Sequence, residues 1–206
     1  MSSEKLRAYK IFNALKKQYP GAKIALSYSN NFELLVAVML SAQTTDIQVN
    51  KVTRNLFPKY GGKSEKEEIG NFANANLKTL EKDINSVGLY KTKAKNIKRT
   101  AQLILVKFRG KIPKTMDKML LLPGVGRKTA NVVLWNAYGV ISGIAVDTHV
   151  IKQTKDLGLT KNTDPGKIEK DLMTLFDKKD WPMVTYLLIE YGRDMRRNKN
   201  NKLLLA

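Results

Sequence analysis

A lysine directly after a glycine-rich turn is the side chain in this sequence best placed to do chemistry. Residues 122–130 read LPGVGRKTA, and Lys128 falls in the first turn of the helix that this segment begins. The positive end of the helix dipole disfavours the ammonium form there, and an amine that attacks carbon must be neutral. Lys128 is therefore a candidate nucleophile. A lysine that binds phosphate would suit this position equally well, so the residue alone does not distinguish a nucleophile from a phosphate ligand.

A second candidate is Asp147, in the segment AVDTHV. It follows an apolar stretch and opens a predicted helix, where an aspartate often does no more than cap free N–H groups. The helix start also keeps the carboxylate ionised, and a fixed anion is useful where a sugar develops oxocarbenium character. Lys128 and Asp147 would together suit cleavage of a glycosidic bond, provided that the fold brings them to one cleft.

The turn that precedes Lys128 joins two predicted helices within five residues, Leu122–Gly126. Its two glycines permit positive φ and a close approach of the backbone to a ligand, and the valine between them can point into the core. The free N–H groups at the start of the second helix form a phosphate site. This pattern is typical of a helix-hairpin-helix, which clamps the DNA backbone; an ordinary corner between helices is the alternative. We predict DNA contacts from Gly124, Val125, Gly126 and Arg127.

A weaker copy of the same pattern lies earlier, in the segment VGLYKTK at residues 87–93. A glycine turn again precedes a lysine-rich helix start, which predicts DNA contacts from Lys91 and Lys93. A glycine that ends one helix, followed by a solvated face, explains the segment equally well.

Composition favours a nucleic-acid partner. The 206 residues carry 37 Lys and Arg against 18 Asp and Glu, a net charge of +19. A net charge of this size destabilises a protein through self-repulsion unless the protein normally binds a polyanion. Nucleic acid is the favoured partner, and an anionic membrane or a ribosome is the alternative. No apolar run approaches the ~18 residues of a membrane span, and the N-terminus has no apolar stretch typical of a secretory signal. We therefore expect a cytoplasmic protein.

The cysteine count limits the cofactors. With no cysteine and a single histidine, His149, the chain cannot form a disulfide, a thiolate zinc site or a cysteine-ligated iron–sulfur cluster. We expect no metal and no cofactor.

Apolar spacing predicts helices nearly throughout and no strand, so the predicted fold class is all-α. The boundaries follow from caps, breakers and apolar periodicity. The predicted helices cover residues 4–18, 31–40, 46–57, 65–73, 77–87, 91–108, 115–122, 127–138, 147–157 and 165–176, and a last one begins at Asp180.

The segments LPGVGRKTANVVL and AVDTHV resemble endonuclease III and the wider helix-hairpin-helix glycosylase superfamily. The resemblance extends upstream to FELLVAVMLSAQ at residues 32–43, to Thr45-Asp46 and to VGLY at residues 87–90, and covers about residues 5–195. It implies two helical lobes with the active-site cleft between them. One lobe would be residues 24–141 with the hairpin, and the other residues 1–23 plus 142–206 with the catalytic aspartate.

The resemblance also implies roles. Lys128 would displace a damaged base at C1′ and form a Schiff base, after which β-elimination cuts the strand, and Asp147 would assist. Gln43 would fill the gap left by the flipped nucleotide, although a surface glutamine at a helix end is its plain alternative. Thr148 would contact DNA. The implied enzyme is a monomeric glycosylase and AP lyase of base excision repair, acting at the nucleoid on duplex DNA with oxidised pyrimidines or abasic sites.

The chain departs from the family at two places. Most family members hold an iron–sulfur cluster with four cysteines near the C-terminus, where this chain has a basic tail instead. Arg196, Arg197 and Lys199 would replace the DNA contacts of that loop, unless the tail is a frayed end. Leu120 stands where the family often has a polar residue. The alternatives are a monofunctional mismatch or adenine glycosylase, which usually lacks a lysine at position 128, and a non-catalytic DNA-binding module.

Overall fold

The computed structural model describes residues 2–197, and all regular structure in that range is helical. The all-α prediction is therefore confirmed for the described part of the chain. The chain divides into two compact units: residues 25–140 form one, and the residues up to Ile24 together with those from Ile141 form the other. We call these the central unit and the terminal unit. No helix among residues 2–197 is long and apolar enough to cross a membrane.

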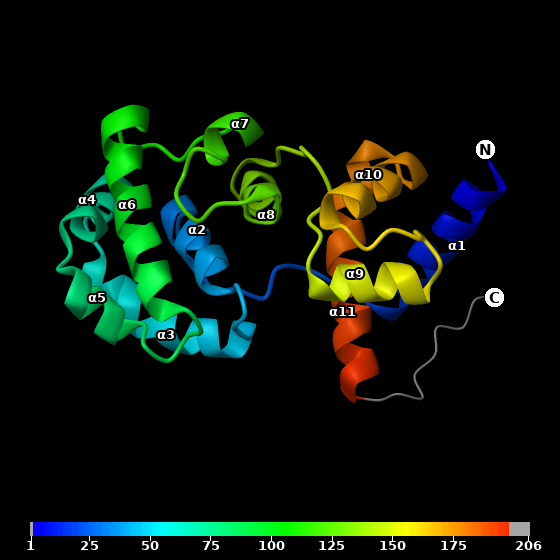
Figure 1. Cartoon of the computed structure of the whole chain (residues 1–206), viewed down its shortest axis with the longest axis horizontal. Coiled ribbons are helices and arrows are strands. Elements are labelled where there is room, and N and C mark those ends of the chain that lie inside the picture. Colours follow the sequence, from blue (N-terminus) through cyan, green and yellow to red (C-terminus); the bar gives the residue numbers. More distant parts are fainter. Residues whose placement is uncertain (1, 198–206) are drawn as a thin grey trace. The chain divides into compact units, whose positions relative to one another are not determined.

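The central unit is built around one helix that is apolar on all sides. This helix, α2, reads NFELLVAVML, and every residue from Phe32 to Leu40 is buried. A helix without a polar face must be surrounded, and α2 packs against α3, α4, α6 and α8 (Figure 1). The helices of the unit are α2 (Asn31–Leu40), α3 (Asp46–Tyr60), α4 (Glu65–Asn74), α5 (Leu77–Asp83), α6 (Tyr90–Phe108), α7 (Met116–Met119) and α8 (Arg127–Tyr138).

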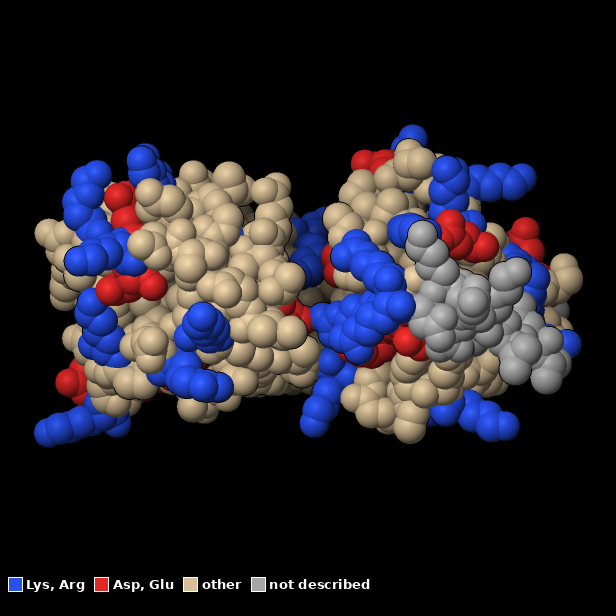
Figure 2. All heavy atoms as spheres, turned by 90° about the horizontal axis from the view of Figure 1, so that it is seen from below, with Lys and Arg blue, Asp and Glu red and all other residues tan. Residues whose placement is uncertain are grey.

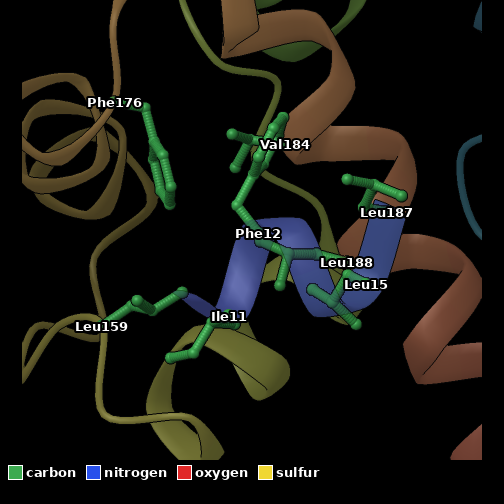
Figure 3. Close-up of a pocket in the computed structure, with 8 residues that line it drawn as sticks. All are labelled: Ile11, Phe12, Leu15, Leu159, Phe176, Val184, Leu187 and Leu188. Carbon is green, nitrogen blue, oxygen red and sulfur yellow. The ribbon is translucent and has the colours of Figure 1, made fainter. Parts of the chain in front are cut away.

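The terminal unit joins the beginning of the chain to its end. Its elements are α1 (Ser3–Gln18), α9 (Thr148–Asp156), α10 (Pro165–Leu175), the short 3₁₀ helix η1 (Lys178–Asp180) and α11 (Trp181–Arg197). Apolar residues of α1 and α11 face one another around a small gap (Figure 3), which is lined by Ile11, Phe12, Leu15, Leu159, Phe176, Val184, Leu187 and Leu188. This apolar contact is the core that holds the two ends of the chain together.

Polar bonds complete this attachment of α1. The hydroxyl of Tyr9 donates to Asp180 over 2.9 Å, and that of Tyr19 donates to Asp194 over 2.8 Å. The guanidinium of Arg7 donates to the carbonyl of Leu157 over 2.9 Å at the end of α9. Hydrogen bonds across about 150 residues of sequence therefore fix α1 against α9 and α11.

Three predicted helices have other bounds in the structure. The helix predicted over 77–87 ends at Asp83, and the residues around 115–122 form a single helical turn, α7. The last helix, α11, begins at Trp181, and Asp180, where it was predicted to begin, is the last residue of η1. The carboxylate of Asp180 accepts a hydrogen bond from the hydroxyl of Tyr9, a tertiary contact that no local pattern predicts. Lys199 and Lys202 of the basic tail lie outside the described residues.

Candidate active site and DNA interface

The two glycines of the hairpin have different roles. Gly124 adopts a φ of +77°, and a Cβ there would lie 2.6 Å from Nδ2 of Asn96. The turn therefore needs glycine at this position for both its backbone and its packing. Gly126 has a φ of −95°, and a Cβ there would meet nothing within 4 Å. Positive φ was expected of either glycine, but only Gly124 shows it, and Gly126 leaves open space at the start of α8.

Helix α6 fixes the hairpin from behind. The hydroxyl of Thr100, a fully buried residue of α6, donates to the carbonyl of Pro123 over 2.9 Å. Val125 is 6% exposed, and its N–H donates to the carbonyl of Leu122 over 3.1 Å. Its predicted core position is confirmed. Its predicted DNA contact stays a prediction, although its side chain is buried and its N–H is already bonded within the turn.

The start of α8 has no cap of its own. Gly126 has no side chain, no acidic residue lies in the first turn, and Arg127 and Lys128 follow at once. Arg127 is exposed and Lys128 is half-buried. The side chain of Lys128 makes no hydrogen bond or ion pair with the described residues of its own unit. The first turn of α8 thus offers a positive dipole end and an uncommitted amine.

Asp147 of the terminal unit caps α9 as predicted. Its Oδ1 accepts from the N–H of Val150 over 2.9 Å, while the residue itself is half-buried. Three buried apolar residues, Ile144–Val146, precede it, and the carbonyl of Ala145 accepts from the hydroxyl of Thr185 in α11 over 3.1 Å. The backbone that carries Asp147 is therefore anchored on both sides, with one carboxylate oxygen bound to the helix.

His149 packs against α11 directly behind this cap. A Cβ on Gly192 would lie 2.6 Å from Nδ1 of His149 and 3.3 Å from the side chain of Gln153. The glycine allows α9 and α11 to approach closely. His149 thus packs between its own helix and α11.

Gln43 lies in the loop between α2 and α3 and is exposed. Its φ is +53°, a left-handed conformation that costs a non-glycine residue about 1–3 kcal/mol. The neighbouring turn before α6 is close, since a Cβ on Gly88 would lie 3.1 Å from the carbonyl oxygen of Gln43. The loop of Gln43 and the turn of Gly88 therefore form one surface feature.

The turn before α6 resembles the hairpin turn in that no side chain caps the helix that follows it. Leu89, the residue directly before α6, has a left-handed conformation with φ +58°. Lys91 is exposed, as its predicted DNA contact requires. Lys93 is 6% exposed, and its ammonium donates to three oxygens inside the protein. The predicted DNA contact of Lys93 is wrong, because this side chain is part of the core.

Sequence reasoning missed Leu89, an apolar side chain that is 57% exposed next to the loop of Gln43. The sequence does indicate its exposure: a leucine in a glycine turn directly before a lysine-rich helix lies outside the apolar face of that helix. Leu120 and Leu121 are also exposed, at 41% and 48%, directly before the hairpin. Among the other predicted contacts, Gly124, Thr148, Arg196 and Arg197 are exposed.

Basic side chains are spread over the face of the molecule that Figure 2 shows. Figure 2 shows lysine and arginine on both units, with acidic groups much sparser on the same face. Groups of three or more His, Asp or Glu side chains that could hold a metal ion do not occur among residues 2–197.

Comparison with known proteins gives one consistent family. Residues 36–178 match the family described as HhH-GPD superfamily base excision DNA repair protein. The sequence is 46% identical over 193 residues to Endonuclease III of Synechocystis sp., covering 94% of this chain and 85% of the relative. It is 45% identical over 176 residues to Endonuclease III of Bacillus subtilis, covering 85% and 77%. The chain therefore belongs to the HhH-GPD superfamily of base excision DNA repair proteins and, within it, to the endonuclease III family.

Solved structures agree with this assignment. A trapped covalent intermediate of endonuclease III with DNA has a TM-score of 0.85 at 39% identity, covering 94% of this chain and 88% of that one. A non-covalent endonuclease III–DNA complex also has a TM-score of 0.85, at 40% identity, with 94% and 87% covered. A thermostable thymine-DNA glycosylase, at 18% identity and a TM-score of 0.76, shares the fold.

Proposed function

We propose that the chain is a bifunctional DNA glycosylase and AP lyase of base excision repair, with Lys128 as the nucleophile. The observation that carries this proposal is the start of α8, where an amine with no bonded partner among the described residues of its unit follows an uncapped helix end beside open space. An amine reserved for structure would be bonded to the protein, as Lys93 is. A relative solved as a covalent intermediate with DNA supports the same chemistry.

The reaction proceeds through an imine. The neutral amine of Lys128 attacks C1′ of the damaged nucleotide, and the base leaves with the electron pair of the glycosidic bond and takes up a proton. The sugar ring opens to a Schiff base between Lys128 and C1′. Loss of a proton from C2′ then expels the 3′ phosphate and breaks the strand. Asp147 accepts the proton that the amine must lose or stabilises positive charge on the sugar, and no cofactor is consumed.

DNA binding uses exposed residues of both units. The backbone at the start of α8 and the side chain of Arg127 hold a phosphate without reading sequence. Gln43 enters the space that the extruded nucleotide leaves, and exposed Leu89 presents an apolar side chain to the neighbouring bases. Lys91, Thr148, Arg196 and Arg197 add contacts to the backbone.

Duplex DNA with oxidised pyrimidines or abasic sites is the proposed substrate, and the enzyme acts as a monomer at the nucleoid in the cytoplasm. It works without an iron–sulfur cluster, since the sequence contains no cysteine to hold one.

Borohydride trapping on a duplex with an oxidised pyrimidine tests the proposal. Borohydride reduces the Schiff base to a stable amine, so the wild type should become covalently attached to DNA. Lys128→Gln should abolish trapping and strand cleavage while DNA binding largely remains. Arg127→Gln is the matched control, because it removes a neighbouring charge from the same helix turn; it should weaken binding and still trap at saturating enzyme.

The two alternatives give other results. A monofunctional glycosylase would release the base without trapping or strand cleavage. A non-catalytic DNA-binding module would do neither. Trapping by Lys128→Gln at the wild-type level would contradict the assignment of the nucleophile.

A further inference from the structure

A buried lysine holds both neighbours of Gln43. The Nζ of Lys93 donates to the carbonyl of Ala42 over 2.5 Å and to the hydroxyl of Thr44 over 3.1 Å, the residues directly before and after Gln43. It also donates to the carbonyl of Leu40, at the end of α2, over 2.8 Å. One ammonium thus uses its three donors on a single short loop.

These acceptors suit a charge at this place. The carbonyl of Leu40 is one of the last in α2, where the helix dipole favours a cation. Lys93 is 6% exposed, and burial lowers its pKa to about 8. Oxygens that lost this donor would be left unsatisfied in the protein interior, which is costly.

The same loop is tied to the turn before α6. The hydroxyl of Thr44 accepts from the N–H of Gly88 over 3.3 Å in addition to the bond from Lys93. Lys93 itself lies in the first turns of α6, and its N–H donates to the carbonyl of Leu89 over 3.0 Å. The loop of Gln43 and the turn of Leu89 are therefore joined through Thr44 and Lys93.

Gln43 needs such support because its backbone is left-handed, φ +53°. A non-glycine residue keeps this conformation only when its surroundings impose it. We propose that Lys93 is a positioning residue for base extrusion: it fixes the left-handed backbone of Gln43 in place before DNA binds. The inference rests on the proposed function of Gln43 as the side chain that fills the gap in the duplex.

Binding to a duplex with a tetrahydrofuran abasic analogue tests this inference without any chemical step. The quantity to measure is discrimination, the ratio of Kd for an unmodified duplex to Kd for the analogue duplex. Lys93→Met keeps the apolar stem and removes the charge. It should lower discrimination by roughly tenfold, the factor that corresponds to about 1.4 kcal/mol. Affinity for the unmodified duplex and its salt slope should stay unchanged, because the ammonium does not reach the surface.

Lys98→Met is the matched control. Lys98 lies in the same helix and donates to a carbonyl, that of Ala75, over 2.6 Å, far from Gln43 in the sequence. It should leave discrimination at the wild-type value. A double-mutant cycle with Gln43→Ala supplies the second control: if Lys93 acts through Gln43, Lys93→Met should cause no further loss in that background.

Thr44→Val provides an independent route if Lys93→Met does not fold. It removes one acceptor of Lys93 and the acceptor of the Gly88 N–H, and it should lower discrimination, whereas Thr44→Ser should restore it. Wild-type discrimination in folded Lys93→Met or Thr44→Val would overturn the inference. So would a parallel loss of affinity for both duplexes with a smaller salt slope, which would indicate a phosphate contact. Failure of the proposed chemistry would show separately, as absence of borohydride trapping.

Discussion

The starts of α8 and α9 have nearly the same backbone and opposite chemistry. Gly126 and Asp147 both precede their helices in extended conformation, with φ of −95° and −113°. Asp147 supplies its own anion to the N–H of Val150, whereas the start of α8 has no cap and carries two cations. One helix end is closed by the protein and the other is left for an anion from outside. The residue before the helix thus decides whether a dipole end is structural or binds a ligand.

The largest expected effect tests whether Asp147 is more than a cap. Asp147→Asn keeps a side chain that can cap the helix, so the free energy of unfolding should change by less than about 1 kcal/mol. Turnover should fall by about 10²–10⁴-fold, because the amide cannot take a proton or balance positive charge. Thermal melting and single-turnover cleavage on one preparation give both quantities.

Asp164→Asn is the matched control for this prediction. Asp164 caps α10 with the same bond, Oδ1 to the N–H of Lys167 over 2.9 Å. It should lose as little stability as Asp147→Asn and keep full activity. Equal and small activity losses in the two variants would mean that Asp147 is only a cap.

The next prediction separates the two hairpin glycines. Gly124→Ala should destabilise the protein by roughly 2 kcal/mol or more, because alanine at φ +77° is strained and its Cβ meets Asn96. Gly126→Ala should fold normally, since its Cβ meets nothing, yet weaken binding to every duplex about tenfold by filling the phosphate space. Melting temperatures and Kd values measure the two effects. Unchanged DNA affinity in Gly126→Ala would show that the open space is not used.

Sequence reasoning found most helices because caps and apolar periodicity are local signals. Thr45, Asp147 and Asp164 cap α3, α9 and α10, whose starts were predicted within one residue, and the predicted all-α class is confirmed for the described residues. The DNA contact predicted for Lys93 was wrong because lysine side chains are usually exposed to solvent, whereas this one is buried. It precedes buried Ile97 by four residues and therefore lies on the apolar stripe of α6, so the spacing did carry the signal. Its three acceptors belong to a loop about 50 residues earlier, and no local pattern predicts that contact.

The start of α4 extends the comparison to a helix with excess negative charge. Glu65, Glu67 and Glu68 occupy its first turn, and Glu68 is 3% exposed. The pKa of Glu68 is raised to about 7, mainly by burial; a hydrogen bond from Asn30 opposes this rise, and the charges of Glu33 and Glu65 add to it. The folded protein therefore binds more protons here than the unfolded chain between about pH 4.5 and 7.

The contribution of Glu68 to the free energy of unfolding should therefore fall as pH rises from about 4.5 to 7 and stay constant above pH 7. Glu68→Gln should remove this decline and stabilise the protein at pH 8 by on the order of 1–3 kcal/mol. Denaturant unfolding at pH 5 and pH 8 measures the difference. Glu67→Gln, at an exposed position of the same turn, is the control and should change neither value appreciably. A Glu68→Gln variant less stable than wild type at pH 8 would contradict the prediction.

The smallest expected effect concerns cations at a helix C-terminus. Arg196 and Arg197 end α11, where the dipole favours cations without any ligand. If they hold phosphates, replacing both and Lys199 by glutamine should reduce the slope of log K against log salt by about 0.9 for each lost contact. Single-turnover cleavage at saturating enzyme should stay the same. An unchanged slope would mean that Arg196, Arg197 and Lys199 make no contact with DNA phosphates.

The central claim is that the amine at the uncapped start of α8 becomes bonded to the sugar. Its most direct test is the identity of the attached residue after borohydride reduction of the wild-type reaction on an oxidised-pyrimidine duplex. Nuclease and protease digestion followed by tandem mass spectrometry should place the sugar remnant on Lys128 alone. A remnant on the N-terminal amine or on another lysine, with Lys128 unmodified, would contradict the account.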